Sequence, residues 1–374
     1  MPTTAWWKRN RPDPPRDADL PSAAMKRHPA NPLIIPQMVR PSAPGLRVRG
    51  VFNPAATRFG DEILLLLRVA EDCETDAGEV AVPIVRFSEG AGHVEILRLS
   101  RDDPKVDTSD SRYVRHRDRT HLSTLSHLRL ARSGDGVHFK VEDRPFLFPA
   151  DATESFGVED ARITRMGDVF YVNYTCVSPD SWATTLVSTR SFRTVDRIGI
   201  IFPPQNKDVC VFPEKIDGHY CALHRPQNSG YGQPSIWYAE SPDLVHWGRH
   251  ACLIRPRRNG LEDERVGGGA PPIKTNAGWL HIYHAAGADG AYRLFAVLLD
   301  QDDPRRVLGR SPRPLLQPEM DYEKQGFMGH VVFTNGIVPH PDGRVSIYYG
   351  AADQTTCLAE TSVDELLASL ETVT

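Results

Sequence analysis

The chain has 374 residues, 40% of them hydrophobic and 25% charged, and a formal net charge of −4. Such a chain can bury a large core, and its weak negative charge argues against nucleic acid or an anionic membrane as the main partner. Its six cysteines are scattered without a CxxC pair, which favours reduced, buried thiols. The apolar run at 63–70 is too short to span a bilayer, and the N-terminus lacks the apolar core of a signal peptide. We therefore expect a cytoplasmic protein.

The first 30 residues differ in composition from the rest. Basic residues alternate there with prolines and short side chains, and Trp6 and Trp7 are the large apolar residues near the start. This composition predicts a flexible or clasping N-terminal arm over residues 1–30. Residues 31–374 are predicted to form one catalytic domain.

A hairpin-like segment recurs five times after the arm. In each copy one residue stands seven positions before a turn glycine: the pairs are Asn53 and Gly60, Asp160 and Gly167, Val211 and Gly218, Pro271 and Gly278, and Gly336 and Gly343. Each copy reads as a short strand, a glycine-bearing turn and a more apolar strand. From the second copy onward the turn glycines lie about 50 to 65 residues apart, which is typical of multi-stranded blades. We predict an all-β fold, a five-bladed β-propeller with the active site in its central channel.

Two further segments complete the chain. The stretch 112–132 is the most basic one, and we interpret it as a solvated strand face, with a substrate-entry rim or a subunit contact as alternatives. The similar sequences of residues 133–139 and 241–247 predict two copies of one turn on the outer strands. Residues 362–373 alternate apolar and acidic positions at helical spacing, which predicts a short closing helix.

Polar side chains concentrate where the repeated strands end. In a propeller these ends can meet at the axis: Arg68, Asp160, His224, Arg225, His284 and Asp353. Glu159 and Asp160 are consecutive on one strand, so alternation predicts that only one of them faces the channel.

Four cationic candidates accompany this carboxyl group: Lys207, Arg225, Arg265 and His284. Together they predict an anion pocket, although each of them alone could be a surface salt-bridge partner. Glycines 267–269 favour close strand approach over a nucleotide loop, because no GxxxxGK context exists. His281 and His284 lie three apart on a strand and point to opposite faces, so we expect no metal site.

The motifs, in chain order, resemble those of glycoside hydrolase family 130 over roughly residues 30–370. They read VFNPAA, GVEDARI, NKDVCVFPEKI, LHRP, GGGAPPI with GWLHIYH, DPRRVLGRSPRPLLQPE, VVFTNGIV and YYGAAD. The resemblance implies a five-bladed propeller and inverting phosphorolysis of a β-mannosidic bond, which gives α-mannose 1-phosphate. It further implies Asp160 as the general acid, acting through a mannose hydroxyl.

The resemblance also implies the binding residues. Phosphate would be bound by Lys207, Arg225, Arg265 and His284. The mannose of the donor subsite would be bound by Asn53, Arg68 and Asp353. No cofactor is implied; inorganic phosphate is the co-substrate. The expected partners are therefore a small oligosaccharide and phosphate, with a homo-oligomer possible.

Residue chemistry supports a phosphorylase over its rivals. An inverting hydrolase needs a second carboxylate to activate water, whereas phosphate is already an anion and needs positioning and charge compensation. A phosphate-independent β-mannosidase of the same fold is the nearest alternative, and a carbohydrate-binding propeller is a more distant one. Short β-1,2-linked manno-oligosaccharides, β-1,2-mannobiose first, are the expected substrates, with β-1,4 linkages possible.

Overall fold

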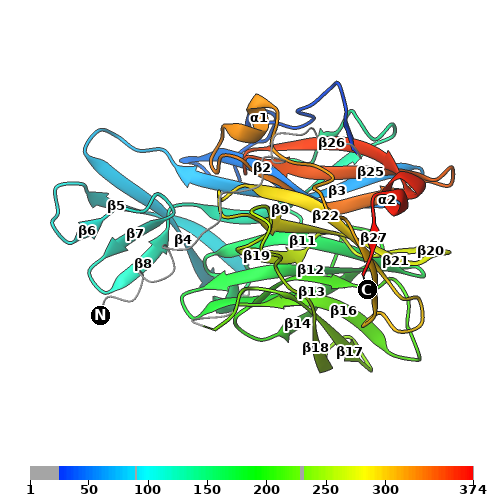
Figure 1. Ribbon diagram of the computed structural model, residues 1–374. Coiled ribbons are helices and arrows are strands. Elements are labelled where there is room, and N and C mark those ends of the chain that lie inside the picture. The colour runs from blue at the N-terminus through cyan, green and yellow to red at the C-terminus, as the bar shows by residue number, and fades with distance from the viewer. Residues whose placement is uncertain (1–24, 89–90, 228–230, 374) are drawn as a thin grey trace.

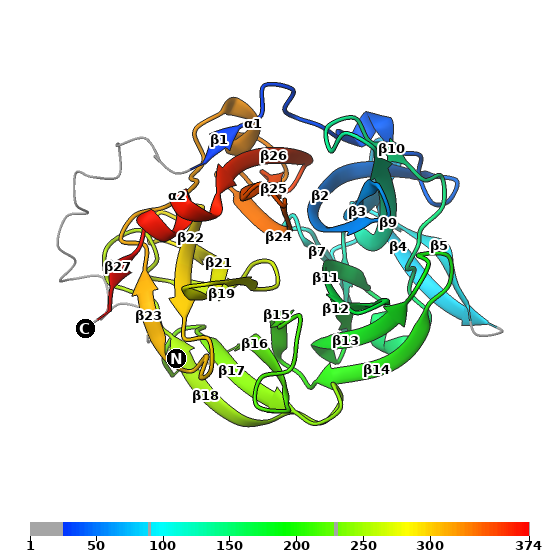
Figure 2. The ribbon, with the colours of Figure 1, turned by 90° about the vertical axis from the view of Figure 1, so that its right-hand side faces the viewer.

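The computed structural model describes residues 25–88, 91–227 and 231–373. They form an almost entirely β protein, as predicted, with two short α-helices and two 3-10 turns within the described ranges. Figure 2 shows five groups of strands set in a ring around a common axis. Most of the predicted arm falls in residues 1–24, outside the described residues, and the arm stays a prediction.

The first two groups belong to one eight-stranded sheet, joined where Gly157 pairs with Ser126. The first group contains β2 (Leu46–Phe59), β3 (Glu62–Cys73), β9 (Leu125–Ser133) and β10 (Lys140–Val141). The second contains β11 (Gly157–Met166), β12 (Val169–Ser178), β13 (Ser181–Thr189) and β14 (Asp196–Phe202). In both groups the strand nearest the axis comes first in the chain (Figure 2).

The other three groups repeat this antiparallel order. The third contains β15 (Asn206–Val211), β16 (Tyr220–Pro226), β17 (Ile236–Ser241) and β18 (Gly248–Ile254). The fourth contains β19 (Arg265–Gly268), β20 (Ile273–Thr275), β21 (Gly278–Ala286), β22 (Tyr292–Leu299), β23 (Val307–Arg310) and β27 (Glu371–Thr372). The fifth contains β24 (Val332–Pro339), β25 (Arg344–Ala351), β26 (Thr355–Ser362) and β1 (Lys26–Arg27). The five hairpins predicted from the turn glycines are therefore confirmed as antiparallel pairs.

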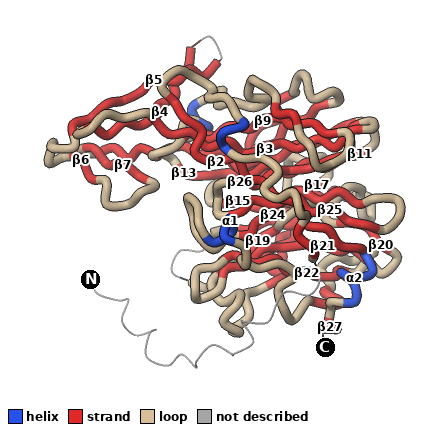
Figure 3. Tube along the Cα trace, turned by 90° about the horizontal axis from the view of Figure 1, so that it is seen from above, coloured by secondary structure: helices blue, strands red, loops and turns tan. Residues whose placement is uncertain are grey.

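A lobe projects from the ring beside the first group (Figure 1). It contains β4 (Glu79–Ser88), β5 (Ala91–Ser100), β6 (Val106–Asp107), β7 (Tyr113–His116) and β8 (Arg119–Leu122). Figure 3 shows the same lobe standing apart from the other strands. The basic stretch 112–132 thus divides: Arg112 and Arg115 are exposed in the lobe and pair with aspartates, whereas Arg129 of β9 is buried.

Apolar side chains fill the spaces between neighbouring groups. Strand β3 shows why its sequence is a continuous apolar run, because both of its faces are covered. Leu64 and Leu66 pack toward the second group, while Leu65 and Leu67 pack toward the fifth. All four are fully buried. Strand alternation thus places one run of leucines in two separate cores.

Local predictions at the turns and cysteines are also confirmed. Asp135 and Asp243 hold their turns identically: each carboxylate accepts two backbone N–H bonds and contacts the histidine three residues later, at 2.7 Å. The six cysteines are free, and only Cys252 is not fully buried.

The helices are short and lie at the edges of the ring. The 3-10 turns are η2 (Pro36–Met38) and η3 (Ala152–Glu154), and the α-helices are α1 (Asp321–Lys324) and α2 (Val363–Ala368). Helix α2 is the predicted C-terminal helix, shorter than 362–373 because the chain forms β27 after it. No helix in the described part of the chain is long and apolar enough to cross a membrane.

The ring closes where the N-terminal strand of the described chain joins the fifth group. Strand β1 pairs with β26, and the Arg27 guanidinium bonds Glu323 at 2.8 Å and Glu319 at 2.8 Å. The Glu323 side chain is fully buried. A buried carboxylate that loses its cation is left uncompensated, so this pair is expected to stabilise the closure strongly.

We predict that Arg27→Ala lowers the free energy of unfolding by about 3 kcal/mol, because Glu323 then stays buried without its main cation. Urea unfolding followed by far-UV circular dichroism measures this. The control is Arg47→Ala, which breaks an exposed pair with Asp72 and should change stability by less than about 1 kcal/mol. Equal effects of the two variants would contradict a closing role for Arg27.

Candidate active site

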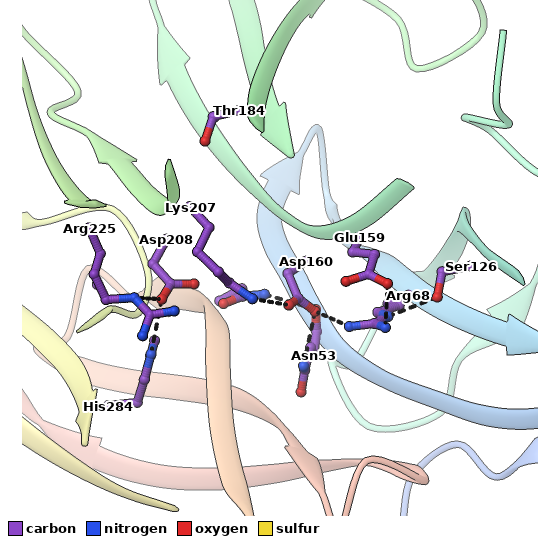
Figure 4. A network of polar contacts seen from close by, with 12 residues as sticks. Asn53, Arg68, Ser126, Glu159, Asp160, Thr184, Lys207, Asp208, Arg225 and His284 are labelled. Atoms are coloured by element: carbon purple, nitrogen blue, oxygen red, sulfur yellow. Dashed lines mark hydrogen bonds and ion pairs between the residues drawn. The ribbon is translucent and has the colours of Figure 1, made fainter. Parts of the chain in front are cut away.

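Three innermost strands share one backbone irregularity. In β2, β11 and β15 the pairing register shifts at a bulge. The bulges contain Asn53, Asp160 and Asp208, whose φ angles are 48°, 48° and 55°. Asn and Asp are the non-glycine residues that tolerate this left-handed region best. A bulge redirects side chains relative to strand alternation, and Figure 4 shows these three side chains within one polar network.

The carboxylate of Asp160 is buried among donors from two other strand groups, the first and the third. Asn53 Nδ2 donates to Asp160 Oδ1 at 3.0 Å, and Arg68 Nη1 donates to the same oxygen at 3.2 Å. On the other side, Lys207 Nζ lies 3.7 Å from Asp160 Oδ2. The structure therefore brings together four of the predicted site residues.

The prediction that only one of Glu159 and Asp160 faces the channel is wrong. Arg68 contacts both carboxylates, since its Nη2 also donates to Glu159 Oε1 at 2.7 Å. The physical reason is the bulge between Glu159 and Arg162, which interrupts the alternation on which the prediction depended. Arg68 is further held by Ser126, whose Oγ accepts from Nε at 3.0 Å.

A second cluster, missed in the sequence, is centred on Asp208. Its Oδ2 lies 2.8 Å from Arg225 Nε and 3.3 Å from His284 Nε2. Its Oδ1 accepts a hydrogen bond from Arg162 Nη2 at 3.3 Å. The Asp208 side chain is fully buried, and two arginines and a histidine of different strands converge on its carboxylate. The available signal was a second charged residue directly after Lys207 in the strand NKDVCV.

Arg162 joins the two clusters. Its side chain is almost fully buried, and its Nη1 donates to the backbone oxygen of Asp160 at 2.9 Å. Nη2 and Nε donate to the carbonyl oxygens of Gly268 and Gly269, at 2.8 Å and 3.0 Å. A planar, five-donor guanidinium can satisfy this many acceptors at once. Arg162 therefore fixes β11 against the glycine run of the fourth group.

The glycine run confirms the close-approach interpretation. A Cβ on Gly267 would lie 2.4 Å from His284 Nε2, and one on Gly268 would lie 2.7 Å from the Asp208 carbonyl oxygen. A Cβ on Gly269 would lie 2.5 Å from the Ile282 carbonyl oxygen. Side chains at these positions would displace the site, so glycine is required for the strands to approach.

Two predicted residues occupy different positions. Arg265 is exposed at the start of β19, where its Nη1 donates a hydrogen bond to the Tyr292 hydroxyl at 3.4 Å. His224 follows the opposite face of β16 from Arg225, and its ring nitrogens contact Asn206 and His250. The geometry thus gathers Lys207, Arg225 and His284, while Arg265 stands outside their network. In the described ranges no group of three or more His, Cys, Asp or Glu could hold a metal ion.

The site holds two carboxyl groups with opposite pKa shifts. Burial alone raises the pKa of Asp160, but the charges of Arg68, Lys207 and Arg162 outweigh it and lower the pKa to about 2. Burial raises the pKa of Asp353 to about 7, with Arg68 opposing the rise and Asp160 adding to it. Asp160 is therefore ionised at neutral pH, whereas Asp353 is about half protonated.

We predict that Asp353→Asn stabilises the fold increasingly as pH rises from 4 to 7. Between the unfolded pKa near 4 and the folded pKa, the native state binds more protons than the unfolded state. The wild-type protein therefore loses folding stability through Asp353 as pH rises. The gain at pH 8 should be roughly 2–4 kcal/mol, and urea unfolding across this pH range measures it.

The control for this experiment has the opposite sign. Although burial opposes it, hydrogen bonding to Arg293 lowers the pKa of Asp289, so Asp289→Asn should destabilise the fold at neutral pH. A stability difference for Asp353→Asn that does not change with pH would contradict the raised pKa.

Comparisons with known proteins identify the family of the chain. A family profile described as β-1,4-mannooligosaccharide phosphorylase, Glyco_hydro_130, matches residues 112–372. The β-1,2-mannobiose phosphorylase of Listeria innocua serovar 6a is 42% identical over 349 residues, 92% of this chain and 98% of the relative. The 1,2-β-oligomannan phosphorylase of Thermoanaerobacter sp. (strain X514) is 40% identical over 232 residues, 61% of this chain and 76% of the relative. The solved complex of the Listeria innocua enzyme with β-1,2-mannobiose superposes with a TM-score of 0.86 at 41% identity, covering 92% of this chain and 98% of the other. The chain belongs to glycoside hydrolase family 130.

Proposed function

We propose that this chain is an inverting β-mannoside phosphorylase. It cleaves β-1,2-linked short manno-oligosaccharides, β-1,2-mannobiose first, with inorganic phosphate to give α-mannose 1-phosphate. The linkage is proposed from the 42% identity to a β-1,2-mannobiose phosphorylase over nearly the whole of both chains. We also propose that the five strand groups are the blades of a five-bladed β-propeller with the site in its channel.

One observation carries the proposal: the cluster around Asp208, next to Asp160, holds buried nitrogen atoms that have no hydrogen-bond partner in the described part of the chain. Among the described residues, Arg225 Nη1 and His284 Nδ1 are buried without a hydrogen-bond partner. Lys207, 3.7 Å from Asp160, is also close enough to Asp208 to lower its pKa, so it stands between the two clusters. A buried cationic group with spare donors suits an anion such as phosphate.

The proposed reaction forms a bond between a phosphate oxygen and the anomeric carbon while the glycosidic bond breaks. Asp160 supplies a proton to the leaving oxygen through a mannose hydroxyl, and the proton of hydrogen phosphate replaces it over the cycle. Asp160 must first be protonated, although its pKa is about 2 in the free site. Bound phosphate supplies the change: Arg68, Lys207 and Arg162 together keep Asp160 ionised, and the negative charge of phosphate beside Lys207 offsets part of their effect.

The donor mannose is proposed to bind Asn53, Arg68 and Asp353. Asn53 and Arg68 already donate to Asp160, so a sugar hydroxyl bound there lies beside the acid. Gly350 makes room for Asn53, since a Cβ at Gly350 would lie 2.2 Å from Asn53 Oδ1. Arg265 lies outside the cluster. It is proposed to contact phosphate from the rim of the site, beside Tyr292, to whose hydroxyl it donates a hydrogen bond.

The alternative is a phosphate-independent β-mannosidase. A hydrolase needs a carboxylate base facing the acid. Glu159 is bound to Arg68 at 2.7 Å, and Asp353 is about half protonated at neutral pH, so neither is well suited to that role. A cytoplasmic location and a homo-oligomeric state remain predictions from the sequence.

We predict that mannose 1-phosphate forms only when phosphate is supplied, and that free mannose stays a minor product. Arg225→Ala should raise the KM for phosphate about tenfold to a hundredfold, because a charged hydrogen-bonding partner contributes roughly 1.5–3 kcal/mol. The KM for mannobiose should change little. Ion chromatography of products from β-1,2-mannobiose, with and without phosphate, measures both. Release of mannose at an equal rate without phosphate would replace this proposal by the hydrolase.

We further predict that Asp160→Asn abolishes phosphorolysis and reverse synthesis together, since one group gives the proton in one direction and takes it in the other. The asparagine keeps the size of the side chain, so mannobiose binding by calorimetry should persist. Substantial activity of this variant in both directions would move the acid to Glu159 or Asp353.

A further inference from the structure

We infer that Asp208 is a positioning residue for phosphate: its carboxylate holds Arg225 and His284 in the arrangement in which they bind the anion. The inference rests on the phosphorylase proposed above. It assigns a role in phosphate binding to a negatively charged residue that does not itself contact phosphate.

The position of Asp208 is fixed from three sides. Arg225 comes from β16 of the same strand group, His284 from β21 of the fourth group and Arg162 from β11 of the second. The Arg225 and His284 side chains are 7% and 1% exposed, so the carboxylate acts without competition from bulk water. Figure 4 shows Arg225 and His284 converging on Asp208.

The contacts to Asp208 decide which atoms stay available. The carboxylate faces Arg225 through Nε, at 2.8 Å, and His284 through Nε2, at 3.3 Å. Arg225 Nη1 and His284 Nδ1 lie on the other sides of the same two groups and are buried without a hydrogen-bond partner among the described residues, whereas Arg225 Nε and Asp208 Oδ2 face each other as an ion pair outside hydrogen-bond geometry. A carboxylate that engages one side of each group orients the other side for a ligand.

The same contact fixes the tautomer of His284. A carboxylate only accepts hydrogen bonds, so the His284 proton is held on Nε2 and Nδ1 carries the lone pair in the neutral ring. Burial lowers the pKa of His284 to about 4, with Asp208 opposing, so the ring is neutral at neutral pH. Nδ1 can then accept a hydrogen bond from the hydroxyl group of hydrogen phosphate, while Arg225 donates to its other oxygens.

Gly267 provides the space for this arrangement. A Cβ there would lie 2.5 Å from Asp208 Oδ2 as well as 2.4 Å from His284 Nε2. Both atoms are ends of side chains, so an alanine at 267 would push the carboxylate and the imidazole apart and leave every charge in place. Asp208 and Gly267 can therefore be tested independently.

The experiment compares Asp208→Asn and Gly267→Ala with the wild-type enzyme. Steady-state kinetics give kcat and both KM values, and calorimetry with inorganic phosphate gives binding without catalysis. Each variant should raise the phosphate KM and Kd about tenfold or more, the expected loss for a charged hydrogen-bonding partner, with the mannobiose KM within about twofold of wild type.

Two matched controls separate positioning from stability. Glu154→Gln removes another buried carboxylate, paired with Arg197 at 2.8 Å and Tyr174, and should lower stability without changing phosphate affinity. Gly248→Ala adds a Cβ with no atom of another residue within 4 Å and should change neither.

Wild-type phosphate affinity in a folded Asp208→Asn or Gly267→Ala variant would overturn the inference, as would a loss confined to kcat. If Asp208→Asn does not fold, Gly267→Ala decides, because it keeps all the charges. Failure of the proposed function is distinct: the wild-type enzyme itself would then form no mannose 1-phosphate, while phosphate calorimetry would still test the anion site.

Discussion

The left-handed backbone at the bulges of β2, β11 and β15 is the constraint on which the site depends. In a regular strand successive side chains point to opposite faces. Every second side chain would then pack between the sheets and could not line the site. The bulges release Asn53, Asp160 and Asp208 from that rule. Backbone strain of this kind persists only where the surroundings stabilise it, and here Arg162 and the Asn53–Asp160 hydrogen bond provide that support.

Many ionisable groups can be buried together near the axis because their positive and negative charges nearly balance. Buried ions are stable only when paired, and the site pairs Arg68 with two carboxylates and Asp208 with several cations. The pairing is uneven, however. Burial raises the pKa of both carboxyl groups, but at Asp160 the charges of Arg68, Lys207 and Arg162 outweigh it, whereas at Asp353 burial prevails, so the two pKa values move apart. Environment and not residue type thus decides which carboxyl group is charged in the free enzyme.

The sequence predicted the hairpins because their signals are local: a turn glycine and an apolar strand after it. Asp160 and Lys207 were predicted from the polar strand ends and the cationic residues near them, with their roles implied by the family resemblance, and they lie together. Asp208 was missed because the repeat was aligned on the turn glycines. That alignment makes Val211 the counterpart of Asp160, whereas the left-handed residue of β15 is Asp208, three residues earlier. The Glu159 error has the same origin, since a bulge is set by neighbouring strands and leaves no local signal. The position of Arg265 depends on the connection between two strand groups, and the repeat pattern does not predict the course of that connection.

Lys207 links the two clusters and gives the proposed reaction its order. In the free site its ammonium group helps keep Asp160 ionised, so the carboxyl group cannot act as an acid at neutral pH. A phosphate that binds beside Lys207 neutralises part of this field and makes protonation of Asp160 easier. By linkage, protonation of Asp160 must in turn favour phosphate binding by the same free energy. Such a site has a protonated acid mainly when phosphate is bound. Water brings no charge and does not cause this protonation, which is a physical reason why it does not replace phosphate.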